Sequence, residues 1–272
     1  MKTSNHLLRR LTAALLAAVL ALSIALPVFA SDDGDTIYIN SVSDLLSLAR
    51  NCAYDQWSVG KTVILQKDLS LEGMLWEPIP SFSGQFKGNG HTISDLTITG
   101  QYSPAGLFGI VEEQGSIESL SVRGVVSVSD SADTTTGGIV GINHGTLISC
   151  QFTGVVTGDS EVGGIVGRNE SEGTIDHSTA RAIVTGKSST GGIAGYNLGA
   201  ITGCTNVGSI NTEYPEASLD TDGFTAKMVD YINNKMAAAD DDATNSVTNV
   251  ATDTGGIAGR SSGMILTSVD RK

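Results

Sequence analysis

Short runs of apolar, often β-branched, and polar residues, with glycine between them, recur along the chain. Residues 117–122 (IESLSV) and 154–157 (GVVT) are examples, and their β-branched side chains favour extended strands. A helical repeat would need amphipathic faces of about 10–15 residues, yet glycine, serine or threonine interrupts these windows. The pattern therefore predicts an all-β fold of many short strands.

A seven-residue block recurs along the chain. It is GGIVGIN at 137–143, GGIVGRN at 163–169, GGIAGYN at 191–197 and GGIAGRS at 255–261, with a degenerate AGLFG at 105–109. The last glycines of these blocks, Gly109, Gly141, Gly167, Gly195 and Gly259, are spaced by 32, 26, 28 and 64 residues. A Gly-x-Ile/Leu step follows each block in phase. This period predicts a β-solenoid whose coils bury their inner faces against one another.

Three copies of the block end in asparagine, at Asn143, Asn169 and Asn197. One asparagine per coil would stack the side chains at the strand spacing of about 4.8 Å. Asparagine also tolerates the left-handed backbone of tight corners. We expect a structural ladder of amides, with a ligand site as the alternative.

The pattern divides the chain into five segments. They are a signal peptide at 1–30, an N-terminal helix and cap region at 31–59, β-helix coils at 60–212, an acidic insertion with an amphipathic helix at 213–252, and a final incomplete coil at 253–272. Within the cap region, residues 44–49 (DLLSLA) are the predicted short helix.

The first segment has the features of an export signal. Lys2, Arg9 and Arg10 precede 16 residues, 11–26, that are apolar apart from one threonine and one serine. A spanning helix wants about 20 apolar residues, so we expect cleavage after Ala30, with an uncleaved anchor as the alternative. No later stretch is long enough to span a bilayer. The predicted location is secreted, extracellular or on the cell surface.

The insertion breaks the 26–32-residue period. Apolar side chains in residues 224–236 follow helical spacing, and an acidic stretch follows them. Such a helix could cover the flank of the solenoid, or it could form a site for a partner or a cation. The tentative partner-binding residues are Phe224, Tyr231, Asp240, Asp241 and Asp242.

Charge and cysteine content narrow the function classes. The chain has 16 Lys+Arg against 29 Asp+Glu, a formal net charge of −13, which disfavours general nucleic-acid binding. Its three cysteines, Cys52, Cys150 and Cys204, form no CxxC pair. Cys150 and Cys204 share one repeat phase two coils apart, about 10 Å by strand spacing. A disulfide needs Cα atoms within about 7 Å, so we expect inward, unbridged thiols.

Candidate catalytic groups are few. Most acids near the repeats fall at predicted turns, where aspartate and serine are ordinary. Those acids are Asp130, Asp133, Asp159, Glu161, Glu170, Glu172 and Asp176. The histidines, His6, His91, His144 and His177, show no metal-binding spacing. We expect no enzyme, no cofactor and no metal site.

The GGIxGxNxGxI pattern resembles the GLUG repeat of bacterial surface and secreted proteins. The run FSGQFKGNGHTI at 82–93 agrees with that resemblance. The resemblance implies a right-handed parallel β-helix on the cell exterior, often in adhesion-related proteins. The repeat also occurs in immunoglobulin A peptidases, but their zinc signature is absent from this sequence, so the resemblance implies no protease activity.

The expected function is that of a non-catalytic exported repeat protein. Its elongated solenoid surface would serve adhesion or binding, with a glycan or a host or cell-surface protein as partner. The alternatives are a structural stalk or spacer of a larger surface protein and a polysaccharide-active β-helix enzyme. An uncovered last coil also predicts end-to-end self-association.

Overall fold

The computed structural model describes residues 35–54, 56–128, 134–211 and 252–271. The described residues all fall within one compact unit. The predicted signal peptide lies outside the described residues, as does the insertion up to residue 251, together with its amphipathic helix.

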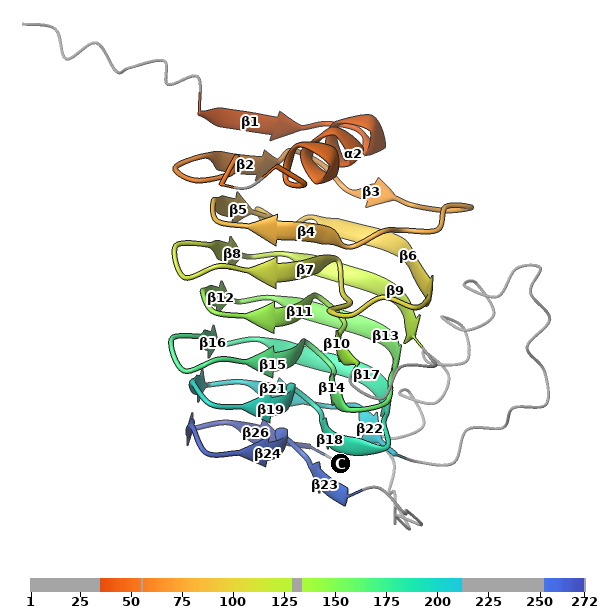
Figure 1. The fold of residues 1–272 in the computed structure, drawn as a ribbon, viewed down its shortest axis with the longest axis vertical. Helices are drawn as coiled ribbons and strands as arrows, with labels where there is room; N and C mark the ends of the chain where they lie inside the picture. Colours follow the sequence, from red (N-terminus) through yellow and green to blue (C-terminus); the bar gives the residue numbers. More distant parts are fainter. Residues whose placement is uncertain (1–34, 55, 129–133, 212–251, 272) are drawn as a thin grey trace, which may run out of the picture. The chain divides into compact units, whose positions relative to one another are not determined.

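The described strands form four sheets, named here A to D, and all their pairings are parallel (Figure 1). Sheet A contains, in spatial order, β1 (Thr36–Ile39), β2 (Thr62–Leu65), β5 (Gln85–Lys87), β8 (Ser116–Glu118), β12 (Thr146–Ile148), β16 (Thr174–Asp176), β20 (Ala200–Thr202) and β25 (Met264–Leu266). Sheet B contains β3 (Leu69–Ser70), β6 (Thr92–Gly100), β9 (Ser121–Val128), β13 (Gln151–Thr157), β17 (Thr179–Thr185), β21 (Thr205–Asn206), β26 (Val269–Asp270) and β22 (Ser209–Ile210), which also pairs with β17. Sheet C contains β4 (Ile79–Phe82), β7 (Phe108–Val111), β11 (Val140–Asn143), β15 (Val166–Asn169), β19 (Ala194–Asn197) and β24 (Ala258–Ser261). Sheet D contains β10 (Thr135–Gly137), β14 (Glu161–Gly163), β18 (Ser188–Gly191) and β23 (Thr252–Gly255).

One coil of the chain visits each sheet once. Strands β14, β15, β16 and β17 lie in sheets D, C, A and B, and β18 then returns to sheet D. Equivalent positions pair in register from coil to coil, as Asn143 does with Asn169 and Asn169 with Asn197. The predicted parallel β-solenoid is therefore confirmed, while its right-handedness stays a prediction.

The interior is made of columns of apolar side chains. Ile117, Leu147, Ile175 and Ile201 occupy one register position of sheet A and are all fully buried. Their flanking residues point outward, because successive side chains of a strand face opposite sides. Each inner residue thus packs on its counterpart one coil away, which explains why no coil can fold alone.

The N-terminal coils have a more aromatic core. Phe82, Phe86 and Phe108 are fully buried, and their ring centroids lie 5.4–6.3 Å apart. Further along, Ala180 and Ala194 occupy interior positions. The core therefore becomes less bulky toward the later coils.

The paired glycines of the repeated block allow chain segments to approach closely. A Cβ on Gly164 would collide with the carbonyl oxygen of Gly192 in the next coil. A Cβ on Gly138 would enter the ring of Phe152 across the interior. Only glycine fits at this bend, where the chain passes from sheet D to sheet C, because a Cβ would clash with neighbouring atoms.

The N-terminal region contributes both a helix and a strand. Helix α2 (Val42–Asn51) contains the predicted segment 44–49, and the Ser41 side chain caps it by accepting a hydrogen bond from the Asp44 N–H at 3.2 Å. Leu45 and Leu48 on its inner side join the core. Before the helix, β1 already pairs with β2 in sheet A, so sheet A begins within the segment assigned to the cap.

The last coil places a strand in every sheet, but its sheet B strand is short. β26 has two residues where β13 and β17 have seven. Ile265 continues the inner column of Ile175 and Ile201, yet it is 39% exposed. The described part of the chain leaves this face of the last coil uncovered.

Candidate functional site

The tentative partner-binding residues fall on the insertion. Their positions lie outside the described residues, so the assignment stays a prediction. They are Phe224, Tyr231, Asp240, Asp241 and Asp242.

The asparagine column is a buried ladder whose amides satisfy one another. Asn143 Nδ2 donates to Asn169 Oδ1 at 2.7 Å, and Asn169 Nδ2 donates to Asn197 Oδ1 at 2.8 Å. All three side chains are fully buried and also donate to backbone carbonyls. The expected structural ladder is confirmed, and Ser261 continues it by accepting from Asn197 at 3.1 Å.

The expected left-handed backbone lies at a different corner. None of the ladder asparagines has a positive φ, whereas Ser149 (φ 53°) and His177 (φ 45°) do. These two residues lie between sheet A and sheet B. The expectation for asparagine was wrong because its side chain is used in the interior, and serine and histidine take the strained corner.

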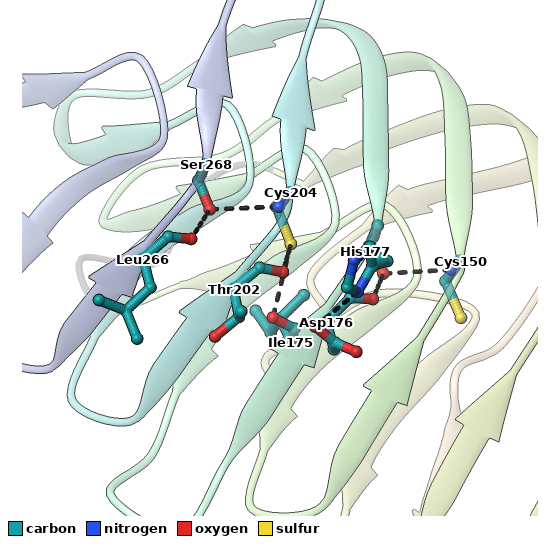
Figure 2. Close-up of polar contacts among 9 residues, drawn as sticks. Cys150, Ile175, Asp176, His177, Thr202, Cys204, Leu266 and Ser268 are labelled. Atoms are coloured by element: carbon teal, nitrogen blue, oxygen red, sulfur yellow. Dashed lines mark hydrogen bonds and ion pairs between the residues drawn. The ribbon is translucent and has the colours of Figure 1, made fainter.

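Cysteine and serine alternate just after this corner (Figure 2). The N–H of Cys150 donates to Ser178 Oγ, and the N–H of Cys204 donates to Ser268 Oγ, each at 3.1 Å. The thiols point inward and donate to backbone carbonyls of sheet A; Cys204 does so to Ile175 and Thr202. The cysteines are unbridged and buried, as expected.

Burial makes these thiols unreactive. It raises the pKa of Cys150 to about 12 and the pKa of Cys204 to about 11. The nucleophilic form is the thiolate, so neither residue is a nucleophile near neutral pH. Cys150 and Cys204 are therefore structural residues at the corner between sheet A and sheet B.

The neighbouring histidine faces solvent. His177 Nδ1 lies 2.8 Å from Asp176 Oδ1, and 67% of the His177 side chain is exposed. A Cβ on Gly203 would lie 3.0 Å from His177 Nε2, so the imidazole packs over the backbone of the next coil. Because the hydrogen bonds of the Cys204 thiol go to carbonyls inside the coil, these residues form no cysteine–histidine pair.

Several of the acids singled out from the sequence contact cations. Asp159 pairs with Lys187 at 2.7 Å. Arg168 pairs with Glu161 at 2.9 Å and with Glu170 at 2.6 Å. Asp130 and Asp133 lie outside the described residues. Within the described ranges, no group of three or more His, Cys, Asp or Glu side chains could hold a metal ion.

Arg168 belongs to an outward row on sheet C. In successive coils Arg168, Tyr196 and Arg260 occupy the same register position. The guanidinium carbons of Arg168 and Arg260 lie 5.1 and 5.5 Å from the centroid of the Tyr196 ring. Burial alone would lower the pKa of Arg168, but the charges of Glu161 and Glu170 raise it. This Arg–Tyr–Arg row is an ordered, charged and aromatic surface of the kind found at binding interfaces.

Sequence reasoning missed this row, although a signal was present. The sixth residue of the repeated block varies most in chemical character: it is Ile142, Arg168, Tyr196 and Arg260 in the four copies. The fourth residue changes only between valine and alanine, as suits a buried position, whereas a change among apolar, charged and aromatic side chains indicates a position that points outward.

Comparison with known proteins agrees with the fold. A model of the GLUG motif matches residues 158–185. This span holds β14, β15, β16 and β17, which is one coil. Within the described residues, no helix is both long enough and apolar enough to cross a membrane.

Two curated relatives share part of the sequence. Halomucin of Haloquadratum walsbyi is 30% identical over 155 residues, which cover 52% of this chain and 2% of halomucin. A protein of Evansella cellulosilytica described as a candidate Gly-rich membrane protein is 29% identical over 137 residues, covering 36% of this chain and 16% of the relative. The chain thus spans a small part of either relative.

Among solved structures, a candidate immunoglobulin A1 protease from Bacteroides ovatus is similar with a TM-score of 0.43 and 15% identity. The similarity covers 65% of this chain and 67% of that chain. The coil at residues 158–185 is thus similar to the GLUG motif, and the repeated block within it recurs in the neighbouring parallel coils.

Proposed function

We propose that this chain is part of a non-catalytic surface repeat protein that binds glycan or protein partners through the outer faces of its solenoid. Surface association is supported by the names of the two relatives, halomucin and a Gly-rich membrane protein. The predicted signal peptide at 1–30 would supply the export that such a location requires.

The observation that carries the proposal is the Arg–Tyr–Arg row of sheet C. The interior polar groups of the ladder are occupied by one another, so recognition falls to the outward side chains. Arg168, Tyr196 and Arg260 are set at strand spacing on a stiff framework. Pre-ordered side chains lose little entropy on binding, and arginine and tyrosine are the residues enriched at interfaces.

The non-catalytic part of the proposal rests on how the reactive groups are used. Burial keeps the Cys150 and Cys204 thiols protonated. Glu161 and Glu170 bind one arginine between them, so their carboxylates are engaged in ion pairs. An acid or base in catalysis needs a pKa matched to its task and access to substrate.

The test is an array of glycans and matrix proteins presented to the exported chain. We expect binding that weakens at least tenfold in a Tyr196→Ala, Arg260→Ala double variant. Tyr38→Ala with Arg50→Ala is the matched control, because Tyr38 is 55% exposed on β1 and Arg50 is exposed on α2.

Other results would redirect the assignment. A folded chain that binds nothing on the array would favour the stalk or spacer. Release of reducing ends from a polysaccharide panel would favour an enzyme. Equal binding by the double variant and the control would remove the Arg–Tyr–Arg row from the interface.

A further inference from the structure

A second outward row lies on sheet B, where the strands are longest. Thr153 of β13 pairs with Arg123 of β9 on one side and with Arg181 of β17 on the other. The two arginines are therefore two coils apart, about 10 Å by strand spacing, with one threonine between them.

Both arginines are exposed. Within the described ranges neither has an ion-pair partner, unlike Arg168, which holds two glutamates. The charge of Arg123 contributes only a minor part of the lowered pKa of Asp68, which comes first from the backbone N–H of Thr92 and then from His91. The two guanidinium groups thus remain available to a ligand.

On β9, β13 and β17 the charged outward residues are the two arginines, whereas the preceding coil holds Asp68, close enough to Arg123 for that cation to contribute to its lowered pKa, and Asp95 at the bulge of β6. The outward positions of β9, β13 and β17 hold hydroxyl, amide, β-branched apolar and arginine side chains, and none is acidic. They are Ser121, Arg123, Val125, Ser127, Gln151, Thr153, Val155, Thr157, Thr179, Arg181, Ile183 and Thr185. In a chain with 29 acids and 16 bases, such a face has a charge opposite to that of the whole molecule.

The accessible part of the face is limited to one end of the strands. Val125 and Val155, two residues beyond Arg123 and Thr153, are only 1% and 8% exposed. On the other side of the arginine row, Ser121, Gln151 and Thr179 form a parallel row of hydrogen-bonding side chains. A ligand would therefore meet two cations and an adjacent line of hydroxyl and amide groups.

We propose that this Arg123–Thr153–Arg181 face binds a linear anionic polysaccharide laid along the solenoid axis. Carboxylate or sulfate groups that recur at about 10 Å along the polymer would meet successive arginines at the strand spacing. Arginine binds planar oxyanions through two parallel N–H groups, and the sugar hydroxyls would bond to the serine, glutamine and threonine row. This inference rests on the proposed binding function and names the ligand class for a different face.

A nucleic acid fits this face less well. Its phosphates recur about every 3.4 Å per strand, and its affinity comes from neutralising many of them. Two arginines on an otherwise acidic protein supply few such contacts. Single-stranded DNA therefore serves as a probe that separates general attraction of anions from polysaccharide binding.

The experiment measures binding of the full exported chain to polygalacturonate and dextran sulfate, with neutral dextran and single-stranded DNA as comparison polymers. We expect salt-sensitive binding to at least one anionic polysaccharide and little to dextran. The double variant Arg123→Ala, Arg181→Ala should weaken binding of the anionic polysaccharide at least tenfold. The control double variant Arg50→Ala, Lys87→Ala removes the same charge from exposed sites elsewhere and should change the affinity for that polysaccharide less than twofold.

A single substitution gives an independent check. Thr153→Glu places a carboxylate between the two arginines, where it can pair with both, so the fold is retained while the positive charge of the row is halved. We expect it to weaken binding without lowering the melting temperature.

The outcomes separate this inference from the proposed function. Unchanged binding by the Arg123, Arg181 double variant, or equal affinity for single-stranded DNA, overturns the inference. A chain that binds array ligands through the Arg–Tyr–Arg row but no anionic polysaccharide also overturns it and leaves the proposed function standing. A chain that binds nothing overturns both.

Discussion

Asn143 and Asn169, 26 residues apart, share a fully buried hydrogen bond of 2.7 Å between their side-chain amides. Asn169 makes the same bond to Asn197. Because neither group meets water, each amide depends on the next coil for its partner. The bond therefore adds a side-chain connection between coils to the pairing of their backbones.

We expect Asn169→Ala to be destabilising for this reason. The substitution leaves Asn143 without its acceptor and Asn197 without its donor, at a cost of about 1–3 kcal/mol for buried polar groups left unsatisfied. The melting temperature should fall by about 2–4 °C per kcal/mol. Gln114→Ala, in an exposed turn, is the control. Equal melting temperatures for the two variants would contradict a stabilising role for the asparagine ladder.

Ile165→Asp should be among the most damaging substitutions. Ile165 is fully buried between coils, so the variant buries an unpaired carboxylate, which is one of the few single changes that cost more than about 4 kcal/mol. Ile142→Asp is the matched control, since Ile142 lies in the neighbouring copy of the block but faces outward. Thermal unfolding followed by circular dichroism should show a large fall in melting temperature for Ile165→Asp and a small fall for Ile142→Asp.

The buried thiols predict a loss of stability at alkaline pH. Cys150 and Cys204 have an ordinary pKa of 9.0, raised to about 12 and about 11 by burial. Above pH 9 the unfolded chain loses these protons while the folded chain keeps them, so stability falls as pH rises from 9 toward 11. Each thiol contributes at most about 1.4 kcal/mol per pH unit in this window.

A Cys150→Ser, Cys204→Ser double variant isolates that effect, because serine already occupies the same corner at Ser178 and Ser268. Urea unfolding at pH 8, 9, 10 and 11 should show a shallower decline for the variant. Parallel declines would assign the alkaline loss to other groups.

The uncovered last coil predicts association in concentrated solution. Ile265 and Met264 are 39% and 57% exposed on β25, which is the edge strand of sheet A within the described residues. Such an edge pairs with other chains unless it is protected. Light scattering should show a mass that rises with concentration, and Ile265→Lys should suppress the rise. A strict monomer at every concentration would mean that the charges of Asp270 and Arg271 protect the edge.

Export can be checked directly. Intact mass and N-terminal sequencing of the exported protein should place Ser31 first, as expected for cleavage after Ala30. Recovery of the chain in the membrane fraction with Met1 retained would indicate an uncleaved anchor.

The repeat made the solenoid predictable, because glycines and β-branched residues recur at one period and only stacked coils can bury them. The sequence did not indicate β1, since four residues before a helix carry little pattern. The sequence indicated the inward position of Ile165, but it did not show that Arg168, Tyr196 and Arg260 share one outward register position, because that depends on how the strands pair. Arg123 and Arg181 share one phase 58 residues apart, but the sequence between them obscures that relationship until the register is known.

The register has a consequence for how such a protein can change its length. Thr157 and Thr185 occupy the same position on β13 and β17, and the stretch that begins after Thr157 and ends with Thr185, residues 158–185, is the span matched by the GLUG motif. A deletion of that span would join Thr157 to Gly186 with every later column still in alignment, and a duplication would insert one further rung. Each coil contacts mainly its neighbours, so gene rearrangement can lengthen or shorten the displayed surface in whole steps while sequence drift alters its outward residues.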